Sequence, residues 1–397
     1  MYLLITLTLL SFIYYFTLGW ALLVLSLAIL ISTNILWQIY RHPGGWKGVY
    51  YKFYSYRYWE FWPANLFYIP VVFYYIYYLF YYRLAPNAIS LVSPCFPYGG
   101  MSFDSKYKML DIFTGHEEFL ARTIYIGPDL LGRADAILGY AQQQGFHFPF
   151  VAKPDKGHRG NGFKVIRNQE QFISYVKRSQ QAFLIQEYID YPLEYGVFWV
   201  KVPGEVGSLI SITRKKLAFL TGDGKSSLRE LIWQDPRARL LSQVYLERNK
   251  SSLDTVLAEK ETFYLGRAGN HCQGAIFEDG EGDLQQKSYE KLFQICNAVE
   301  GFDFGRMDIK FASPESLSNG KGFKIIEVNG SEAEFTHIYD KKYSIPYAYG
   351  ELKRQWKLVF QIARKNKEMG MKPIPHHKLA SLYWSFFRKE GEKILSD

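Results

Sequence analysis

The stretch GRMDIKFASPESLSNGKGFKIIEVNGS, residues 305–331, contains the strongest chemical signal in the chain. Apolar and polar side chains alternate at both of its ends, which predicts two β-strands joined by a polar loop. If the strands pair as a hairpin, Asp308 converges with Glu327 and Asn329, and the side chain of Arg306 lies beside them. Oxygen-bearing side chains without His or Cys suit Mg²⁺ or Mn²⁺ rather than Zn²⁺. A surface hairpin with solvated carboxylates is the alternative on this spacing alone.

Composition indicates a globular protein with an added membrane region. The 397 residues are enough for one or two soluble domains. Aromatic residues make up 18% of the chain and crowd into its N-terminal quarter. The net charge of +9 suits an anionic partner, and without a DNA- or RNA-binding motif we expect nucleotide and membrane rather than nucleic acid. Three widely spaced cysteines argue against a disulfide framework and fit a reducing compartment.

Residues 1–83 predict a membrane-anchoring hydrophobic region. Residues 1–40 contain no Asp, Glu, Lys or Arg, and a single membrane helix needs about 20 apolar residues. Because Gly19 lies near the middle of this long run, we expect two short spans in a tight hairpin, with one long tilted span as the alternative. Residues 41–60 are basic and therefore predicted to be cytoplasmic. Residues 61–82 are long enough to span, but their prolines and tyrosines favour an interfacial segment that does not cross.

A glycine-rich basic loop lies within FPFVAKPDKGHRGNGFKVI, residues 148–166. Two short predicted strands flank the loop, which is the arrangement of a flap that places backbone N–H groups and cations over a polyphosphate. The loop glycines are Gly157, Gly160 and Gly162, and Arg159 is among its cations. The segment is not a P-loop, which has a different spacing and precedes a helix. A glycine-rich hairpin with no ligand is the alternative.

Other segments supply further candidate contacts. Residues 187–194 form a polar, irregular link between two predicted strands, where backbone groups can meet an adenine edge and Glu194 a ribose. Arg214 and Lys216 share one face of a predicted strand and can reach a γ-phosphate or an acidic substrate, whereas Lys215 is equally well placed at a solvated edge. Lys106 begins a predicted helix after a Gly/Pro-rich loop, and a solvated lysine is the alternative there.

The order of these segments resembles the ATP-grasp superfamily of carboxylate–amine ligases, which includes D-alanine–D-alanine ligase, the ribosomal S6 glutamate ligases and cyanophycin synthetase. The resemblance covers about residues 104–365 and implies an α+β fold of two lobes that grip ATP between them, here with N-terminal hydrophobic membrane helices. Its pieces are the helix start at Lys106, Val151-Ala-Lys153-Pro154 with the glycine-rich loop, Gln186-Glu187 with Glu194, Arg306-x-Asp308 and Glu327-x-Asn329. The expected domains are 1–83 for the membrane region, 84–105 for a linker, 106–365 for the ATP-grasp domain (flap lobe about 120–190, metal-binding lobe about 191–365) and 366–397 for a basic tail.

The same resemblance implies roles for individual residues. One group would bind ATP: Lys106 and Lys153 at the α- and β-phosphates, Glu187, Tyr188 and Ile189 around the adenine, Gln186 beside them at the nucleotide, Glu194 at the ribose, and Asn270 at a phosphate or the acyl group. A second group would act at the reacting atoms: Asp308, Glu327 and Asn329 as ligands of Mg²⁺ or Mn²⁺, and Arg306 as the residue that stabilises an oxyanion.

These inferences lead to a membrane-anchored enzyme with a cytoplasmic catalytic domain. We expect it to activate a carboxylate as an acyl phosphate with ATP and to couple it to an amine. The soluble ligases carry a sizeable domain before the grasp, but here only about twenty residues separate Arg83 from Lys106. We therefore expect a lipid-linked or envelope-precursor substrate. A phosphotransferase without ligation and a non-catalytic ATP-binding regulatory module are the alternatives.

Overall fold

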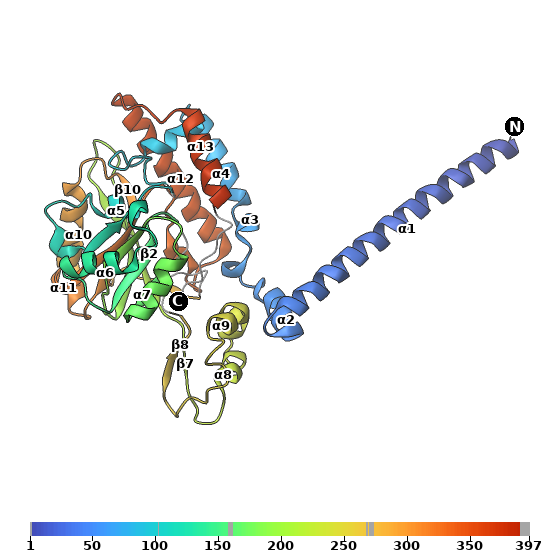
Figure 1. The fold of residues 1–397 in the computed structure, drawn as a ribbon. Helices are drawn as coiled ribbons and strands as arrows, with labels where there is room; N and C mark the ends of the chain where they lie inside the picture. Colours follow the sequence, from blue (N-terminus) through green and yellow to red (C-terminus); the bar gives the residue numbers. More distant parts are fainter. Residues whose placement is uncertain (1, 102, 158–161, 267–268, 270–273, 390–397) are drawn as a thin grey trace. The chain divides into compact units, whose positions relative to one another are not determined.

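The computed structural model describes residues 2–101, 103–157, 162–266, 269 and 274–389 (Figure 1). The described residues form two compact units, and each unit contains two separate segments of the chain. The first unit joins residues 1–61 to 220–263, and the second joins residues 62–219 to 264–397. The chain therefore passes three times from one unit to the other.

The apolar N-terminus forms one continuous helix, α1 (Tyr2–Arg41). The hairpin of two spans expected here is wrong, and the alternative of one long helix is the arrangement found. Gly19 lies inside α1, where a glycine weakens a helix by about 1 kcal/mol but does not supply a turn by itself. Among the described residues, 14–41 form the one helix that is long and apolar enough to cross a membrane, by length and composition.

Short helices make up much of the rest of the first unit. It contains α2 (Gly45–Ser55), η1 (Trp59–Phe61), α8 (Leu228–Gln234), η5 (Ala238–Leu241) and α9 (Ser242–Arg248). The guanidinium of Arg237 donates to both carboxylate oxygens of Glu60, at 3.0 and 2.9 Å. The rings of Tyr51 and Trp233 lie 6.0 Å apart. These contacts join residues 220–263 to the segment that follows α1.

A four-stranded antiparallel sheet forms one lobe of the second unit. Its strand order is β1-β4-β2-β3, with bounds Thr123–Ile126 for β1, Phe150–Pro154 for β2, Lys164–Ile166 for β3 and Phe183–Glu187 for β4. Helices α6 (Ala134–Gln143) and α7 (Gln169–Arg178) cover it, and Ile137, Phe172 and Ile185 are fully buried between helices and sheet. The two predicted flap strands are confirmed as the hydrogen-bonded neighbours β2 and β3.

A five-stranded antiparallel sheet forms the other lobe. Its strand order is β11-β10-β5-β6-β9, with bounds Leu193–Val200 for β5, Ser208–Lys216 for β6, Ile276–Asp279 for β9, Phe304–Phe311 for β10 and Phe323–Asn329 for β11. One face packs on α10 (Gln286–Ala298), where Trp199, Met307 and Leu292 are fully buried. On the opposite face Phe198 packs on Phe335 at one end, and charged residues occupy the other end.

Three helices lie side by side over the Phe198 end of this sheet: α4 (Ile69–Tyr81), α12 (Ile345–Glu368) and α13 (His376–Lys389) (Figure 1). The ring of Tyr75 in α4 lies 5.2 Å from that of Trp356 and 5.1 Å from that of Phe360. Because α4 has 13 residues and packs on a globular core, the structure favours the expectation that residues 61–82 do not cross a membrane. Leu379 of α13 belongs to the same core.

Short elements complete the described chain. They are α3 (Ala64–Phe67), η2 (Pro86–Leu91), α5 (Lys106–Leu110), η3 (Glu117–Phe119), η4 (Pro128–Leu130), β7 (Phe219–Thr221), β8 (Thr262–Tyr264), α11 (Ser316–Asn319) and η7 (Thr336–Tyr339). Strands β7 and β8 pair as a two-stranded ribbon at the second and third passages of the chain between the units.

Candidate functional site

The hairpin of β10 and β11 forms the centre of the candidate site. In its register Asp308 lies directly opposite Glu327, and Arg306 lies opposite Asn329. The pairing expected from the sequence is therefore confirmed. Arg306 Nε donates to Asp308 Oδ1 at 3.0 Å, while Met307 between them points into the apolar layer beneath. Side-chain alternation thus brings the four polar residues of the hairpin to one face of the sheet.

A β-bulge connects this hairpin to the smaller sheet. Strand β11 has one extra residue, Ile326, at a register shift beside Asp308. A bulged residue leaves the regular ladder, so its backbone groups can bond elsewhere. The carbonyl oxygen of Ile326 accepts hydrogen bonds from Lys153 Nζ and Gln186 Nε2, each at 3.1 Å. Lys153 Nζ also donates to Gln186 Oε1 at 3.0 Å. Two buried side chains of the smaller sheet are thereby fixed against the hairpin.

Lys106 reaches the same place from the start of α5. Its Nζ lies 2.6 Å from Glu327 Oε1. Asp155, which directly follows β2, holds this helix: its Oδ1 accepts from Ser105 Oγ at 2.7 Å and from the Tyr107 backbone N at 3.1 Å. The Asp155 carbonyl also accepts from the Lys106 backbone N at 3.0 Å. The sequence pattern did not indicate Asp155, because nothing local to it shows that α5 docks beside the end of β2.

Lys215 on β6 is a member of the site. The solvated edge considered for this residue is wrong, since its side chain is buried. Lys215 Nζ lies 2.9 Å from Asp308 Oδ2 and 3.3 Å from Glu194 Oε1. It therefore joins two of the predicted site residues by ion pairs.

Gly196 makes this contact possible. It lies on β5, which runs between β6 and β10, and it is the residue paired with Asp308. A Cβ at Gly196 would lie 3.1 Å from Arg306 Cδ and 3.5 Å from both Asp308 Oδ1 and Lys215 Cε. Because Gly196 has no side chain, the aliphatic part of Lys215 passes over β5 to the carboxylate of Asp308.

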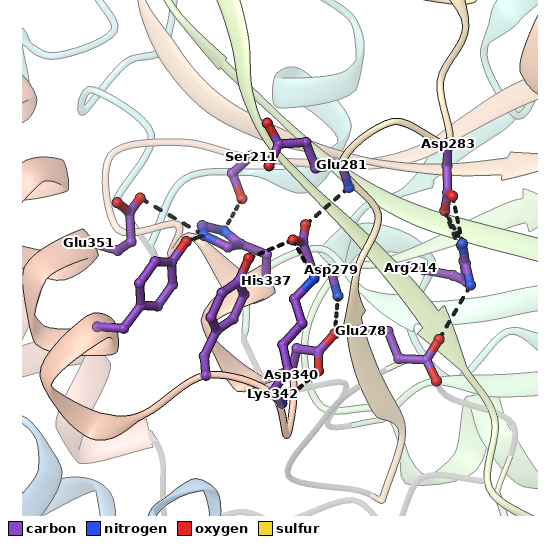
Figure 2. Close-up of polar contacts among 12 residues, drawn as sticks. Ser211, Arg214, Glu278, Asp279, Glu281, Asp283, His337, Asp340, Lys342 and Glu351 are labelled. Carbon is purple, nitrogen blue, oxygen red and sulfur yellow. Dashed lines mark hydrogen bonds and ion pairs between the residues drawn. The ribbon is translucent and has the colours of Figure 1, made fainter.

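Arg214 and Lys216 point to the opposite face, contrary to the expectation that they approach a phosphate. Arg214 binds Asp283 and lies 3.4 Å from Glu278 Oε2, as Figure 2 shows. Lys216 Nζ lies 2.8 Å from the same oxygen of Glu278. Both side chains therefore serve ion pairs at the edge of the sheet.

The burial pattern of β6 explains this correction. Ser211, Thr213 and Lys215 are buried on the face of the site, whereas Ile212 and Arg214 are half-buried on the other. The sequence carries part of this signal, because Ile212, which packs on the apolar layer beneath the sheet, shares its parity with Arg214. A hydroxyl-rich face that ends in lysine marks the polar side of the sheet.

The link after β4 borders the same site. The carbonyl oxygen of buried Ile189 accepts from Lys310 Nζ at 3.0 Å, and this ammonium lies 6.0 Å from the centre of the Tyr188 ring. Glu187 Oε2 accepts from the backbone N of Arg122 at 3.2 Å. Among the other predicted residues, Gly157 and Gly162 flank the flap loop, and Arg159, Gly160 and Asn270 lie outside the described residues.

The charges around Glu327 set the pKa values of the site. Burial raises the pKa of Glu327, but the ammonium groups of Lys106 and Lys153 outweigh burial and hold the pKa at about 2. Burial lowers the pKa of Lys153, against the attraction of Glu327. Burial also lowers the pKa of Arg306, but the carboxylates of Asp308 and Glu327 outweigh it and raise the pKa overall. Glu327 is therefore ionised at neutral pH beside cations from both lobes.

The donor set of the hairpin fits a magnesium ion. Asp308 and Glu327 supply carboxylates from neighbouring strands, and Mg²⁺ commonly takes one or two carboxylates together with substrate phosphates. Asn329 Nδ2 is buried and has no hydrogen-bond partner among the described residues, so this N–H group can donate to a phosphate oxygen, and the amide oxygen Oδ1 is the atom of this side chain that could bind a metal ion. Within the described chain no cluster of three or more His, Cys, Asp or Glu side chains is placed to hold a metal ion. The hairpin therefore fits a metal that is shared with a phosphate rather than enclosed by protein.

A second polar network continues along this face of the sheet (Figure 2). His337 Nδ1 lies 2.7 Å from Ser211 Oγ, and His337 Nε2 lies 3.8 Å from Glu351 Oε2. Asp279 Oδ2 accepts from Lys342 Nζ at 2.9 Å. Burial lowers the pKa of His337, so its imidazole is neutral at neutral pH. The sequence did not indicate this network, because its members come from β6, β9, η7 and α12.

Sequence comparisons find partial matches to a ligase family and to two synthetases. The model of the tubulin-tyrosine ligase family matches residues 119–196. Over 216 residues the chain is 26% identical to a cyanophycin synthetase from Synechocystis sp., a match that covers 48% of this chain and 24% of that protein. A cyanophycin synthetase from Geminocystis herdmanii is 21% identical, with the same coverage of both chains. The matched part of this chain thus spans about a quarter of the length of these relatives.

Solved structures show only distant similarity. A D-alanine–D-alanine ligase from Bacillus anthracis is 13% identical, with 67% of this chain and 68% of that chain covered and a TM-score of 0.39. A bifunctional glutathione synthetase from Pasteurella multocida is 16% identical, with coverage of 63% and 36% and a TM-score of 0.33.

The chain resembles the ATP-grasp superfamily of carboxylate–amine ligases in its sequence matches and in the order of its site segments. Its fold is α+β with two lobes, one that carries the flap strands and one that carries the polar hairpin. Among the described residues, one apolar helix long enough to cross a membrane is found where a hairpin of two spans was expected.

Proposed function

We propose that this chain is an ATP-dependent carboxylate–amine ligase. The observation that carries the proposal is the set of charged groups where the two sheets of the second unit meet. Its cations are Lys106, Lys153, Lys215 and Arg306, and its carboxylates are Glu194, Asp308 and Glu327. Clustered cations suit a polyphosphate, and the carboxylates suit a divalent ion bound to that polyphosphate. The match to relatives that are named synthetases supports the same activity.

ATP would bind with its phosphates beside Lys106 and Lys153 and its adenine beside residues 187–189. The bulge carbonyl and Gln186 already hold the Lys153 ammonium in place. Asp155 does the same for the helix turn that carries Lys106. Donors that are positioned in advance lose little energy to reorganisation when the substrate arrives. Glu194 would contact the ribose.

Asp308, Glu327 and Asn329 are the residues that would hold Mg²⁺ or Mn²⁺. The ion would neutralise charge on the phosphate oxygens when bound. Lys215 and Arg306 bind different oxygens of Asp308 and so fix the plane of its carboxylate. The protein thereby orients this carboxylate toward the position where the ion would bind.

The chemistry proceeds in two steps. A carboxylate oxygen of the first substrate attacks the γ-phosphorus of ATP, the bond to the β-phosphate oxygen breaks, and ADP leaves. An amine nitrogen then attacks the carbon of the resulting acyl phosphate, the bond to the phosphate oxygen breaks, and the nitrogen loses a proton to give an amide. Lys106 and Lys153 would stabilise the charge on the transferred phosphoryl group. Arg306 would stabilise the oxyanion in the second step, a contribution of about 3 kcal/mol in comparable sites.

Helix α1 supports attachment of the enzyme to a membrane, with the basic residues 41–60 and the two lobes on the cytoplasmic side. A carboxylate or amine substrate that is lipid-linked, or that belongs to an envelope precursor, would then lie close to the enzyme.

A product analysis of the full-length protein tests this function. With Mg²⁺-ATP and a panel of amino acids, peptides and amines, a ligase forms an amide together with equal amounts of ADP and phosphate. Asp308→Asn is expected to abolish ADP release, whereas Asp254→Asn, at a side chain that is 88% exposed in the other unit, leaves it unchanged. A phosphorylated product without an amide, or ATP binding without ADP release, would contradict the proposal and indicate a phosphotransferase or a regulatory module.

A further inference from the structure

Helix α4 presents a continuous apolar stripe on its outward side, while Val71 and Tyr78 on its other side are buried. The spacing of three and four residues within the stripe is that of one face of a helix. Each side chain of this α4 stripe is between 43% and 74% exposed: Ile69, Val72, Phe73, Ile76, Tyr77, Phe80 and Tyr81. Soluble proteins rarely expose a contiguous apolar patch of this kind, and such patches mark sites of contact with proteins or membranes.

The composition of the α4 stripe favours lipid as its partner. Residues 61–82 contain no Asp, Glu, Lys or Arg, whereas helix faces that pair with another helix are commonly flanked by charges that select the partner. Tyr77 and Tyr81 carry a hydroxyl on an apolar ring, which is typical of residues at the boundary between lipid tails and water. Because α4 has 13 residues and a membrane span needs about 20, the helix would lie along the bilayer surface.

Cations lie next to α4. Arg83 follows the helix by two positions, and its side chain is exposed. Arg364 of α12 reaches the same end, where its Nη1 donates to the carbonyl oxygen of Tyr82 at 3.3 Å. Lys353 and Lys357 are exposed and share a face of α12 with Arg364, because their spacings of four and seven residues repeat the helix turn. These positive charges suit the phosphate groups of lipid headgroups.

We propose that the α4 stripe lies in the surface of a phospholipid bilayer and holds the second unit on the membrane. The proposal rests on the membrane attachment by α1 proposed above and adds a contact made by the second unit itself. A helix of this type buries its apolar face about 5–10 Å into the boundary between headgroups and lipid tails. One short apolar surface gives only reversible binding, as a single acyl chain does, so α4 would act together with α1 and would not replace it.

Photocrosslinking on the full-length protein in nanodiscs tests the proposal. The probe is p-benzoylphenylalanine in place of Phe73 or Phe80, and the nanodiscs contain equal amounts of phosphatidylcholine and phosphatidylglycerol. Mass spectrometry is expected to find lipid adducts at both positions. Tyr140, an exposed aromatic residue on α6 in the same unit, is the matched control position and should give none. No lipid adduct at Phe73 and Phe80, equal adducts at Tyr140, or a cross-link to a second copy of the chain in place of lipid would overturn the proposal.

Charged substitutions in the α4 stripe provide a second test, with the probe kept at Phe80. Ile69→Asp combined with Phe73→Asp is expected to lower the yield of lipid adduct by about fivefold or more, because a carboxylate is costly at this depth of a bilayer. Val206→Asp combined with Phe219→Asp, at apolar side chains that are 85% and 56% exposed, should leave the yield unchanged. Circular dichroism checks that both variants are folded. An unchanged yield in the variant of the stripe would contradict its contact with lipid.

A probe in α1 separates this proposal from the membrane attachment on which it rests. The same amino acid in place of Leu25 should give lipid adducts when α1 lies in the bilayer. Adducts at Leu25 but at neither Phe73 nor Phe80 would mean that the attachment stands and this proposal fails. Adducts at Phe73 and Phe80 without any at Leu25 would mean the reverse. Because none of these measurements uses turnover, absence of amide formation would contradict the ligase function and leave the α4 stripe assigned to lipid.

Discussion

Lys215 Nζ lies 2.9 Å from Asp308 Oδ2, although the two residues belong to strands that are separated by β5. The contact crosses the middle strand at Gly196, where no side chain stands in the way. This ion pair places a buried cation beside the carboxylate proposed for the metal. The neighbours of Lys215 along the strand, Arg214 and Lys216, point to the opposite face of the sheet and pair with Glu278 instead.

Replacement of Lys215 should therefore differ sharply from replacement of Lys216. Lys215→Met removes a buried cation and leaves Asp308 and Glu194 uncompensated, so we expect ADP release to fall by about 100-fold. Lys216→Met removes a half-exposed ion pair with Glu278, and its effect should stay within about twofold. Steady-state assays of both variants measure this, with circular dichroism as the control for folding. Equal effects of the two substitutions would contradict the assignment of Lys215 to the site.

Gly196 provides a test of space rather than charge. Gly196→Ala places a Cβ 3.1 Å from Arg306 Cδ, which small shifts can relieve, whereas Gly196→Val adds methyl groups that displace Arg306 or Lys215. We expect activity to fall in the order wild type, Ala, Val, with about a tenfold loss or more for Val. The melting temperature of the Val variant should also fall, because overpacking beside buried charges costs about 1–3 kcal/mol, so activities are compared well below it. A Val variant with full activity would show that the close approach at Gly196 is unimportant.

Asp155 is predicted to act on ATP binding through Lys106. Asp155→Ala removes the acceptor of Ser105 Oγ and of the Tyr107 backbone N, so the helix turn that carries Lys106 loses its anchor. We expect the KM for ATP to rise by about tenfold with a smaller change in kcat, since a positioning contact is lost rather than a charge on the substrate. Asp129→Ala, in the same lobe, is the matched control. A fall in kcat at unchanged KM would argue against a positioning role.

The pKa of Glu327 predicts a pH dependence of stability. Its folded-state pKa of about 2 lies below the usual value of 4.5, so the ionised side chain stabilises the folded state. This contribution is complete above about pH 4.5 and is lost as the pH falls through about 2. Urea unfolding of wild type and Glu327→Gln should differ by on the order of 2 kcal/mol at pH 6 and progressively less toward pH 3. Glu170→Gln, at an exposed helix position, should show no such trend. A difference between wild type and Glu327→Gln that does not vary with pH would contradict this role.

The fold also predicts where the membrane helix can be removed. Deletion of residues 2–41 removes α1, and none of the described side chains of this helix is buried. We therefore expect the remaining chain to fold and to leave the membrane fraction. A chain that begins near Ala85 would in addition lose Glu60, which pairs with Arg237, and Tyr75, which packs on Trp356. We expect that shorter chain to aggregate. Size-exclusion chromatography and membrane pelleting check both outcomes. Loss of folded protein in the first deletion would show that α1 has a structural role.

The sequence predicted those parts of the site that depend on strand alternation within one segment. Asp308 and Glu327 are paired as expected, because apolar neighbours determine the faces of β10 and β11. On β6 three consecutive cations hide the parity, and Ile212 alone, on the apolar face, indicates that Arg214 and Lys216 point away from the site. Asp155 and His337 could not be predicted, since their partners come from distant segments. Three loop residues, Arg159, Gly160 and Asn270, lie outside the described chain and stay predictions.

The three passages of the chain between the two units affect how the protein responds to a protease. A single cut between residues 61 and 62 leaves the lobes attached to the first unit through residues 219–220 and 263–264. The last two passages are hydrogen-bonded to each other, with the Leu265 backbone N donating to the Ala218 carbonyl at 2.8 Å. After that cut only non-covalent contacts hold residues 1–61 to residues 220–263, among them the ion pair of Arg237 with Glu60. A nicked molecule would therefore stay in one piece as long as these contacts persist, and a denaturant would be needed to separate α1 from the lobes.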